Sequence, residues 1–133
     1  MQVQPYLFFD GRCDEALEFY AKAVGAKVGT LLRFKDGPDK SMAAANADKV
    51  MHAQFQIGES KLFASDGRAS GQPKFDGFAL TITAGTAAEA DKLFAALADG
   101  GKVTMPLAQT FFSPRFGMLV DRFGVHWIVL AAQ

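Results

Sequence analysis

The stretch EALEFYA (residues 15–21) decides the fold, because a related stretch, EADKLFA (residues 89–95), follows it 74 positions later (89 − 15 = 74). After a slip of one residue, GAKV (residues 25–28) matches GGKV (residues 100–103). A repeat of about half the chain is too long for a solenoid and too short to bury a good core alone. The sequence therefore predicts two copies of a small α+β module packed as one domain.

The order of predicted elements is the same in both halves: a strand, a helix and three more strands. Strands are expected at residues 3–9, 28–34, 50–57 and 61–65 with a helix at 14–24, and then at 78–83, 102–107, 116–120 and 125–130 with a helix at 86–98. Each helix needs a sheet face to cover its apolar stripe, and the remaining faces enclose a cup if the sheets curl together. This predicts two βαβββ modules forming an eight-stranded, cup-shaped, mostly antiparallel sheet.

Two segments interrupt the pattern. Residues 67–74 contain glycine, serine and proline and are the predicted linker between module one (1–66) and module two (75–133). Residues 35–49 are polar and rich in small side chains, and we expect a mobile loop there, at the mouth of the cup.

Composition narrows the class of protein. The chain has 133 residues, half of them hydrophobic, with 13 Phe, which suits one domain with a real core. Fourteen basic residues balance 14 acidic ones, so no basic block predicts nucleic-acid binding, and zero net charge favours self-association. The single cysteine, Cys13, excludes an internal disulfide, and no signal peptide or membrane span is evident. We expect a cytoplasmic protein without membrane partners.

Four motifs carry a resemblance to a known family: PYLFFDG (5–11), EALEFY (15–20), MHA (51–53) and DRFGVHW (121–127). Together they resemble the PhnB-like branch of the vicinal oxygen chelate superfamily, which holds glyoxalase I, extradiol dioxygenases and fosfomycin and bleomycin resistance proteins. PhnB-like members are often labelled glyoxalase/bleomycin resistance proteins or a ubiquinone-pathway methyltransferase. The resemblance implies paired βαβββ modules forming an open cup, usually in a homodimer.

The same resemblance locates the metal ligands of the superfamily, in the first and last strands of each module. The matching positions in this chain are Pro5, Leu62, Phe78 and Ile128. None of these side chains offers the imidazole nitrogen or carboxylate oxygen that a divalent metal binds. We therefore expect no metal and no other cofactor.

Two regions offer polar or aromatic groups for a ligand. His52 matches a recurrent histidine of the branch; it either faces a substrate or is a polar partner on its strand. The stretch FFSPRFG (111–117) offers ring area from Phe111 and Phe112 and a planar cation, Arg115, for a carboxylate or phosphate. Alternatively, these aromatic residues close the core or the dimer contact.

Three other residues have structural and functional interpretations. Asp121 with Gly124 is typical of an Asx-type hairpin turn. Cys13, near a helix start, is either an activated thiol or a buried, inert one, and the second is favoured. Asp66, after the fourth strand, stays a candidate functional group.

The preferred hypothesis is a metal-free protein that binds a small, partly apolar organic molecule in the cup. The ligand-binding candidates are Phe9, Leu62, Phe78, Ile128, Phe111 and Phe112 as apolar lining, with His52 and Arg115 as polar contacts. One alternative is a divalent-metal enzyme of the glyoxalase or dioxygenase type, with His52 as its first candidate ligand. Another is a structural or regulatory homodimer with a filled cup. Whether any reaction is catalysed stays open.

Overall fold

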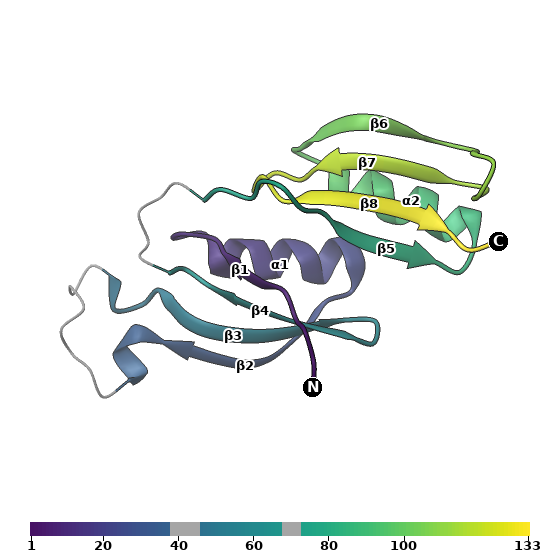
Figure 1. Ribbon diagram of the computed structural model, residues 1–133. Coiled ribbons are helices and arrows are strands. Elements are labelled where there is room, and N and C mark those ends of the chain that lie inside the picture. Colours follow the sequence, from purple (N-terminus) through teal and green to yellow (C-terminus); the bar gives the residue numbers. More distant parts are fainter. Residues whose placement is uncertain (38–45, 68–72) are drawn as a thin grey trace. The chain divides into compact units, whose positions relative to one another are not determined.

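The computed structural model describes residues 1–37, 46–67 and 73–133, in two compact units, Met1–Pro73 and Lys74–Gln133 (Figure 1). The N-terminal unit contains β1 (Tyr6–Phe8), α1 (Cys13–Val24), β2 (Lys27–Arg33), the 3-10 helix η1 (Phe34–Asp36), β3 (Val50–Ile57) and β4 (Ser60–Ser65). The C-terminal unit contains β5 (Leu80–Ala84), α2 (Ala87–Ala98), β6 (Lys102–Ala108), β7 (Phe116–Val120) and β8 (His126–Ala131). The predicted βαβββ order is confirmed in both units.

The eight strands form two four-stranded sheets, ordered β1-β4-β3-β2 and β5-β8-β7-β6, where we expected one eight-stranded sheet. In each sheet the first and last strands of the module pair in parallel and the other neighbours pair antiparallel. The repeat in the sequence is therefore also a repeat of topology. That the two sheets enclose a cup stays a prediction.

The boundary between the units, after Pro73, falls inside the predicted linker. Part of that linker (68–72) and the middle of the predicted loop (38–45) lie outside the described residues. Neither described α-helix, each of 12 residues, is long and apolar enough to cross a membrane.

The core of the N-terminal unit lies between α1 and one face of its sheet. Tyr20 of α1 is fully buried, and its ring stacks on that of Phe55 at 6.3 Å between centroids. Phe9, which follows β1, also packs against Tyr20, and the centroids of the two tilted rings are 6.0 Å apart. The helix ends at Gly25, whose φ of 70° is the left-handed conformation that glycine adopts without strain.

Asp66 connects three segments of this unit through its buried carboxylate. Oδ1 accepts hydrogen bonds from the backbone N–H groups of Gly11 and Cys13, at 2.8 Å each, and Oδ2 accepts one from Val50 at 2.7 Å. The turn after β1, the start of α1 and the start of β3 are thereby held together. This geometry gives Asp66 a structural role.

The thiol of Cys13 belongs to the same buried region. Burial, reinforced by the negative charge of Asp66, raises the pKa of the Cys13 thiol well above its ordinary value. The neutral, enclosed thiol is a poor nucleophile, which agrees with the favoured interpretation of this residue.

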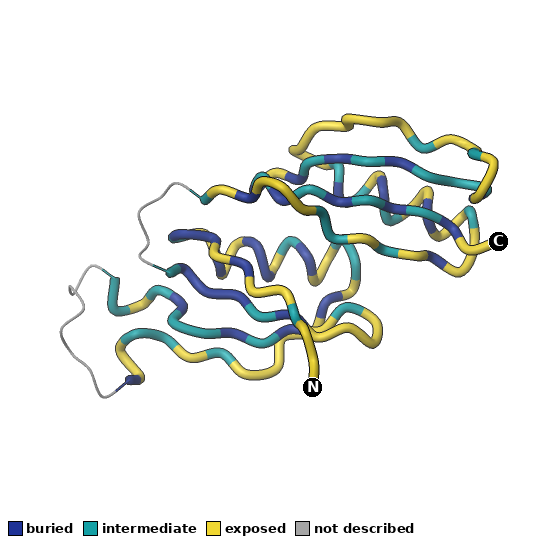
Figure 2. The backbone as a smooth tube through the Cα atoms, viewed as in Figure 1, coloured by how far each residue is buried: buried dark blue, intermediate teal, exposed yellow. Residues whose placement is uncertain are grey.

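The C-terminal unit packs α2 on one face of its own sheet. Along β8, buried and half-buried residues alternate (Figure 2), so Trp127 and Val129 face the helix while Ile128 points to the other side. A Cβ at Gly117 would lie 2.9 Å from the ring of Phe94 in α2 and 3.0 Å from backbone atoms of Met105 and Leu107 in β6, so a glycine suits this crowded position. Thr86 caps the start of α2, since its Oγ1 accepts the N–H of Glu89.

Asp121 forms the hairpin between β7 and β8. Its Oδ1 accepts the N–H groups of Phe123 and Val125, and Oδ2 accepts the indole N–H of Trp127 at 2.8 Å. The predicted Asx-type turn is confirmed, and the same carboxylate also satisfies the buried indole.

Candidate functional site

The candidate site lies on the face of the N-terminal sheet opposite α1, here called the distal face. In β3, Ala53 and Phe55 are buried toward α1, so the alternation of the strand directs His52 and Gln54 to the distal face. In β1, Leu7 is buried, whereas Tyr6 and Phe8 are 38% and 53% exposed.

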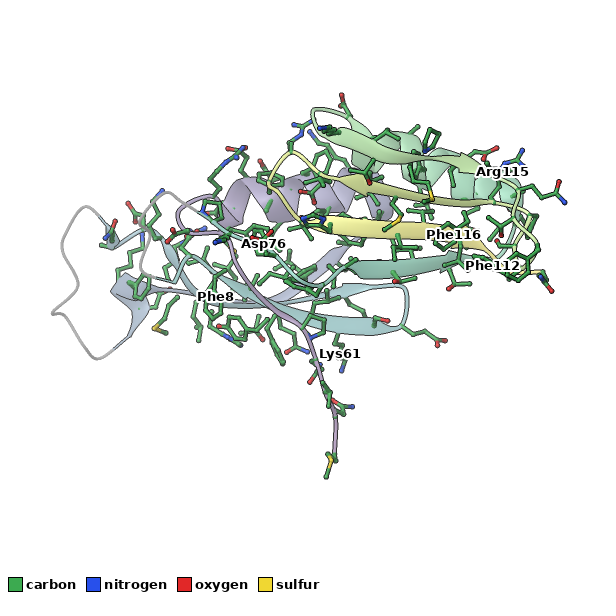
Figure 3. The ribbon with its side chains drawn as sticks, turned by 45° about the horizontal axis from the view of Figure 1, so that its top comes forward. Phe8, Lys61, Asp76, Phe112, Arg115 and Phe116 are labelled. Atoms are coloured by element: carbon green, nitrogen blue, oxygen red, sulfur yellow. The ribbon has the colours of Figure 1, made fainter. Side chains whose placement is uncertain are left out.

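Four rings gather on this face: Tyr6 and Phe8 from β1, His52 from β3 and Phe63 from β4. We call them the aromatic–histidine cluster. Tyr6 stacks on Phe8 with 4.9 Å between centroids, and it lies 5.6 Å from His52 and 5.8 Å from Phe63. His52 and Phe63 are 5.4 Å apart. Figure 3 shows Phe8, together with Lys61 of β4, on the side of the sheet away from α1.

Strand pairing explains how the rings meet. Tyr6 is the partner of Phe63 in the parallel β1/β4 ladder, and Phe63 is the partner of Gln54 in the antiparallel β3/β4 ladder. His52 is two residues from Gln54 on the same face, so the long Tyr6 side chain can cross to it diagonally. The hydroxyl of Tyr6 is 2.8 Å from Nδ1 of His52, which fixes the imidazole orientation.

Two predicted lining residues lie on the opposite face from this cluster. Phe9 is fully buried against Tyr20, and Leu62 is buried as the strand partner of Phe55, on the α1 side of the sheet. Their neighbours Phe8 and Phe63 occupy the distal face instead. The predicted residues are each one position away from the residues on the distal face, and a step of one position along a strand reverses the face to which the side chain points.

Two aromatic candidates of the C-terminal unit, Phe111 and Phe112, lie close to the start of β7. The ring of Phe112 lies 5.1 Å from that of Phe111 and 5.2 Å from that of Phe116, both edge to face. Phe111 is 97% exposed. Ile128 is on the sheet face opposite α2, paired with Met118. A role for these residues beside His52 stays a prediction.

Phe78 precedes the strand in which we expected it. The predicted strand 78–83 is observed at Leu80–Ala84, and Phe78 lies in the segment before it with its ring partly exposed. The first-strand metal-ligand position that the resemblance assigns to Phe78 therefore lies outside the sheet.

Arg115 already has an acidic partner. Its Nε lies 3.0 Å from Oδ1 of Asp91 in α2, and Nη1 donates to the backbone oxygen of Pro114. Phe112, Arg115 and Phe116 lie at the same end of the C-terminal unit (Figure 3). Both charged side chains are partly exposed, and such a pair contributes about 0–1 kcal/mol, so a ligand could displace it.

The described residues do not fit the divalent metal of the superfamily. The four positions that the resemblance assigns to ligands carry only hydrocarbon side chains: Pro5, Leu62, Phe78 and Ile128. Residues 1–37, 46–67 and 73–133 contain no group of three or more His, Cys, Asp or Glu side chains that could hold an ion. These side chains therefore support no catalytic step that uses a bound metal.

Comparison with known proteins assigns the chain to a family. Residues 1–130 match the family model described as 3-demethylubiquinone-9 3-methyltransferase. The chain is also 30% identical, over 138 aligned residues, to Protein YjdN of Escherichia coli K12, covering 97% of this chain and 94% of that protein. The chain belongs to the PhnB-like branch of the glyoxalase/bleomycin resistance superfamily.

Solved structures agree with this membership. Protein PA1353 from Pseudomonas aeruginosa is similar with a TM-score of 0.89 and 41% identity, over 100% of this chain and 98% of that one. The PhnB protein from Bacillus cereus is similar with a TM-score of 0.82 and 26% identity, over 99% and 100%. The predicted PhnB-like fold is therefore confirmed.

Proposed function

We propose that this PhnB-like protein binds a small, partly apolar organic molecule without a metal, and that the aromatic–histidine cluster is its contact surface in the N-terminal unit. The observation that supports the proposal is the Tyr6–His52 hydrogen bond within a group of partly exposed rings. Such a surface combines apolar area with an oriented polar group, which is the usual composition of small-molecule sites.

The exposed rings supply a driving force for binding. Covering about 100 Å² of apolar surface contributes about 2.5 kcal/mol, and a well-placed ring pair adds about 0.5–1.5 kcal/mol. Tyr6 and Phe8 are the rings most available for such contacts. A further hydrogen bond to His52 would fix the orientation of the ligand.

Binding without conversion suits the residues that are present. A binding protein needs affinity and an oriented contact, and it does not need the carboxylate and imidazole ligands that the superfamily positions lack. In the C-terminal unit, Phe78, Ile128, Phe111, Phe112 and Arg115 stay proposed ligand contacts.

A ligand-observed NMR screen tests the proposal with a matched pair of variants. Phe8→Ser removes an exposed apolar side chain from the cluster, whereas Val103→Ser removes an exposed apolar side chain from β6 of the C-terminal unit, which has no part in the proposed site. We expect the wild type and Val103→Ser to bind the same set of small aromatic compounds and Phe8→Ser to lose most of them, with circular dichroism verifying the fold. Equal binding by both variants would remove the cluster from the site.

The family description suggests one further probe. S-adenosylmethionine, the common methyl donor, belongs in the screen because the matching family model is described as a methyltransferase. Under our proposal it does not bind. Saturable binding together with methyl transfer to a phenolic acceptor would favour an enzyme over a binding protein.

A further inference from the structure

We infer that the molecule recognised by the aromatic–histidine cluster is a planar aromatic anion, an inference that rests on the proposed function. An oxygen of its acidic group accepts a hydrogen bond from Nε2 of His52, and its ring covers Phe8 and Tyr6. Lys61 supplies the compensating positive charge.

The Tyr6 hydroxyl determines which imidazole nitrogen carries the hydrogen. The Tyr6 hydroxyl lies 2.8 Å from Nδ1 of His52, a contact in which the donor depends on the tautomer of the imidazole. We assign the hydroxyl as the donor, because a phenol donates to an unprotonated imidazole nitrogen more effectively than its oxygen accepts. The hydrogen of the neutral ring is then on Nε2, because the tautomer follows the bond made by the other nitrogen. In the protonated ring Nε2 also carries a hydrogen. The cluster thus offers a ligand a donor, and the matching ligand atom is an acceptor.

The charges of the sheet favour a negative ligand. The four strands of the N-terminal unit contain Lys27, Arg33 and Lys61 and no Asp or Glu. Arg33 is bound to Asp14, which compensates its charge. Lys61 is exposed and lies on the same face as Phe63, but it is the strand partner of Gln56, four residues or about 14 Å along β3 from His52. Its flexible side chain spans part of this distance, so its charge attracts an anion toward the cluster.

The ring angles favour a flat ligand. Neighbouring rings of the cluster are inclined by 22°, 32°, 33° and 44°, so none of these pairs is edge to face. Tyr6 and Phe8 are stacked, so a planar ring can extend the group by stacking on a partly exposed ring such as Phe8. A saturated ring would touch such a ring only at its projecting hydrogens.

An aromatic group of this kind could in principle hold a cation over its ring faces. Two features of this surface disfavour a cation as its ligand. The donor at Nε2 of His52 and the ammonium of Lys61 both repel positive charge, and no strand of the sheet supplies a carboxylate to offset them. An anion is therefore the ligand that the surface fits.

Four probes separate these ligand classes in calorimetric titrations of the full chain. They are 1-naphthoate, its neutral isostere 1-naphthamide, the non-planar anion cyclohexanecarboxylate and the cation phenyltrimethylammonium. We expect 1-naphthoate to bind at least about tenfold more tightly than each of the others, because a charge-assisted hydrogen bond is roughly twice as strong as a neutral one. Equal affinity for naphthoate and naphthamide, or tighter binding of the cation, would overturn the inference.

Two matched pairs of variants assign the preference to its residues. His52→Phe keeps a ring and removes the donor, with His126→Phe as the control in β8; Lys61→Gln removes the charge, with Lys102→Gln as the control in β6. We expect His52→Phe and Lys61→Gln each to reduce the naphthoate-to-naphthamide ratio at least about threefold and the controls to leave it unchanged. Unchanged ratios in both cluster variants would contradict the assignment.

The tautomer has a separate readout. Nitrogen-15 NMR of the ligand-free protein should show the His52 hydrogen on Nε2, and a neutral ring with its hydrogen on Nδ1 would overturn the inference. Different results would exclude the ligand class and the proposed function. If cluster-dependent binding persists without preference for the anion, the proposed function stands and the ligand class is wrong. If no probe and no screened compound depends on Phe8, the proposed function itself fails.

Discussion

Replacing Asp66 by asparagine should strongly destabilise the N-terminal unit. The carboxylate is 1% exposed and accepts three backbone N–H groups. Asparagine keeps one acceptor oxygen, which can serve Gly11 and Cys13, but its amide turns a donor toward the N–H of Val50. The lost bond to a charged group costs about 1.5–3 kcal/mol, and the unsatisfied buried N–H adds about 1–3 kcal/mol. A loss of about 4 kcal/mol is a large part of the 5–15 kcal/mol typical of a domain.

Native-state hydrogen exchange is the suitable assay, because it reports the stability of each segment separately. We expect the amides of Gly11, Cys13 and Val50 to exchange much faster in Asp66→Asn, together with those of β3 and β4. Asp76→Asn is the control, since its carboxylate is exposed and 3.9 Å from Lys74, and it should change stability by less than about 0.5 kcal/mol. A loss below about 1 kcal/mol in Asp66→Asn, with these three amides still protected, would refute the reasoning.

Three further predictions follow from the same structure. Because the folded pKa of Cys13 is raised, its neutral thiol contributes stability that is fully present below the ordinary thiol value of about 8.5 and is lost as pH rises above it. In urea unfolding between pH 7 and 10, the free energy of unfolding should therefore fall more steeply with pH for the wild type than for Cys13→Ala. The same dependence on pH in both proteins would contradict this. Nickel, zinc, manganese and iron(II) should leave the thermal unfolding midpoint unchanged, because the ligand positions carry hydrocarbon side chains; a saturable rise in the midpoint with one of them would revive the metal-enzyme alternative. We expect a homodimer, and sedimentation at the 14.3 kDa mass of one chain would contradict it.

The secondary structure was largely predictable because its signals are local. The predicted strand over residues 50–57 has the same bounds as β3, and the predicted helix 86–98 matches α2 to within one residue. The buried stripe of each helix and the glycine after α1 follow from the same short-range rules. The first strand of each module was predicted least well: residues 3–9 were expected where β1 is Tyr6–Phe8, and 78–83 where β5 is Leu80–Ala84, because the apolar Phe78 precedes the ladder.

The candidate site was harder to predict because it depends on which side of a strand faces the helix. Tyr6, Leu7, Phe8 and Phe9 are all apolar or aromatic, so their pattern does not distinguish the two faces. The buried face is set by distant partners, as when Leu62 pairs with Phe55. His52 was identifiable, since it is a polar residue on an alternating strand, but its bond to Tyr6 joins residues 46 positions apart.

Arg115 illustrates the same limit for charges. Because Arg115 lies between aromatic residues and a strand in the sequence, we expected its guanidinium group to bind a ligand. Its partner Asp91 is 24 residues away on α2 and approaches only when the helix packs on β7. A pairing of this kind is a tertiary event that no local spacing encodes.

The duplication preserved the scaffold while the two modules diverged in their polar groups. Each unit buries one aspartate that accepts three N–H groups, but Asp66 follows β4 whereas Asp121 follows β7, the strand equivalent to β3. These carboxylates therefore arose at different places and stabilise different turns. The faces away from the helices diverged too, since β8 carries Ile128 on that face where its equivalent β4 carries Phe63. Within residues 1–37, 46–67 and 73–133, a histidine bonded to a tyrosine is found in the N-terminal sheet alone. A repeat of fold thus needs no repeat of chemistry, and recognition can be concentrated in one module while the other keeps only the architecture.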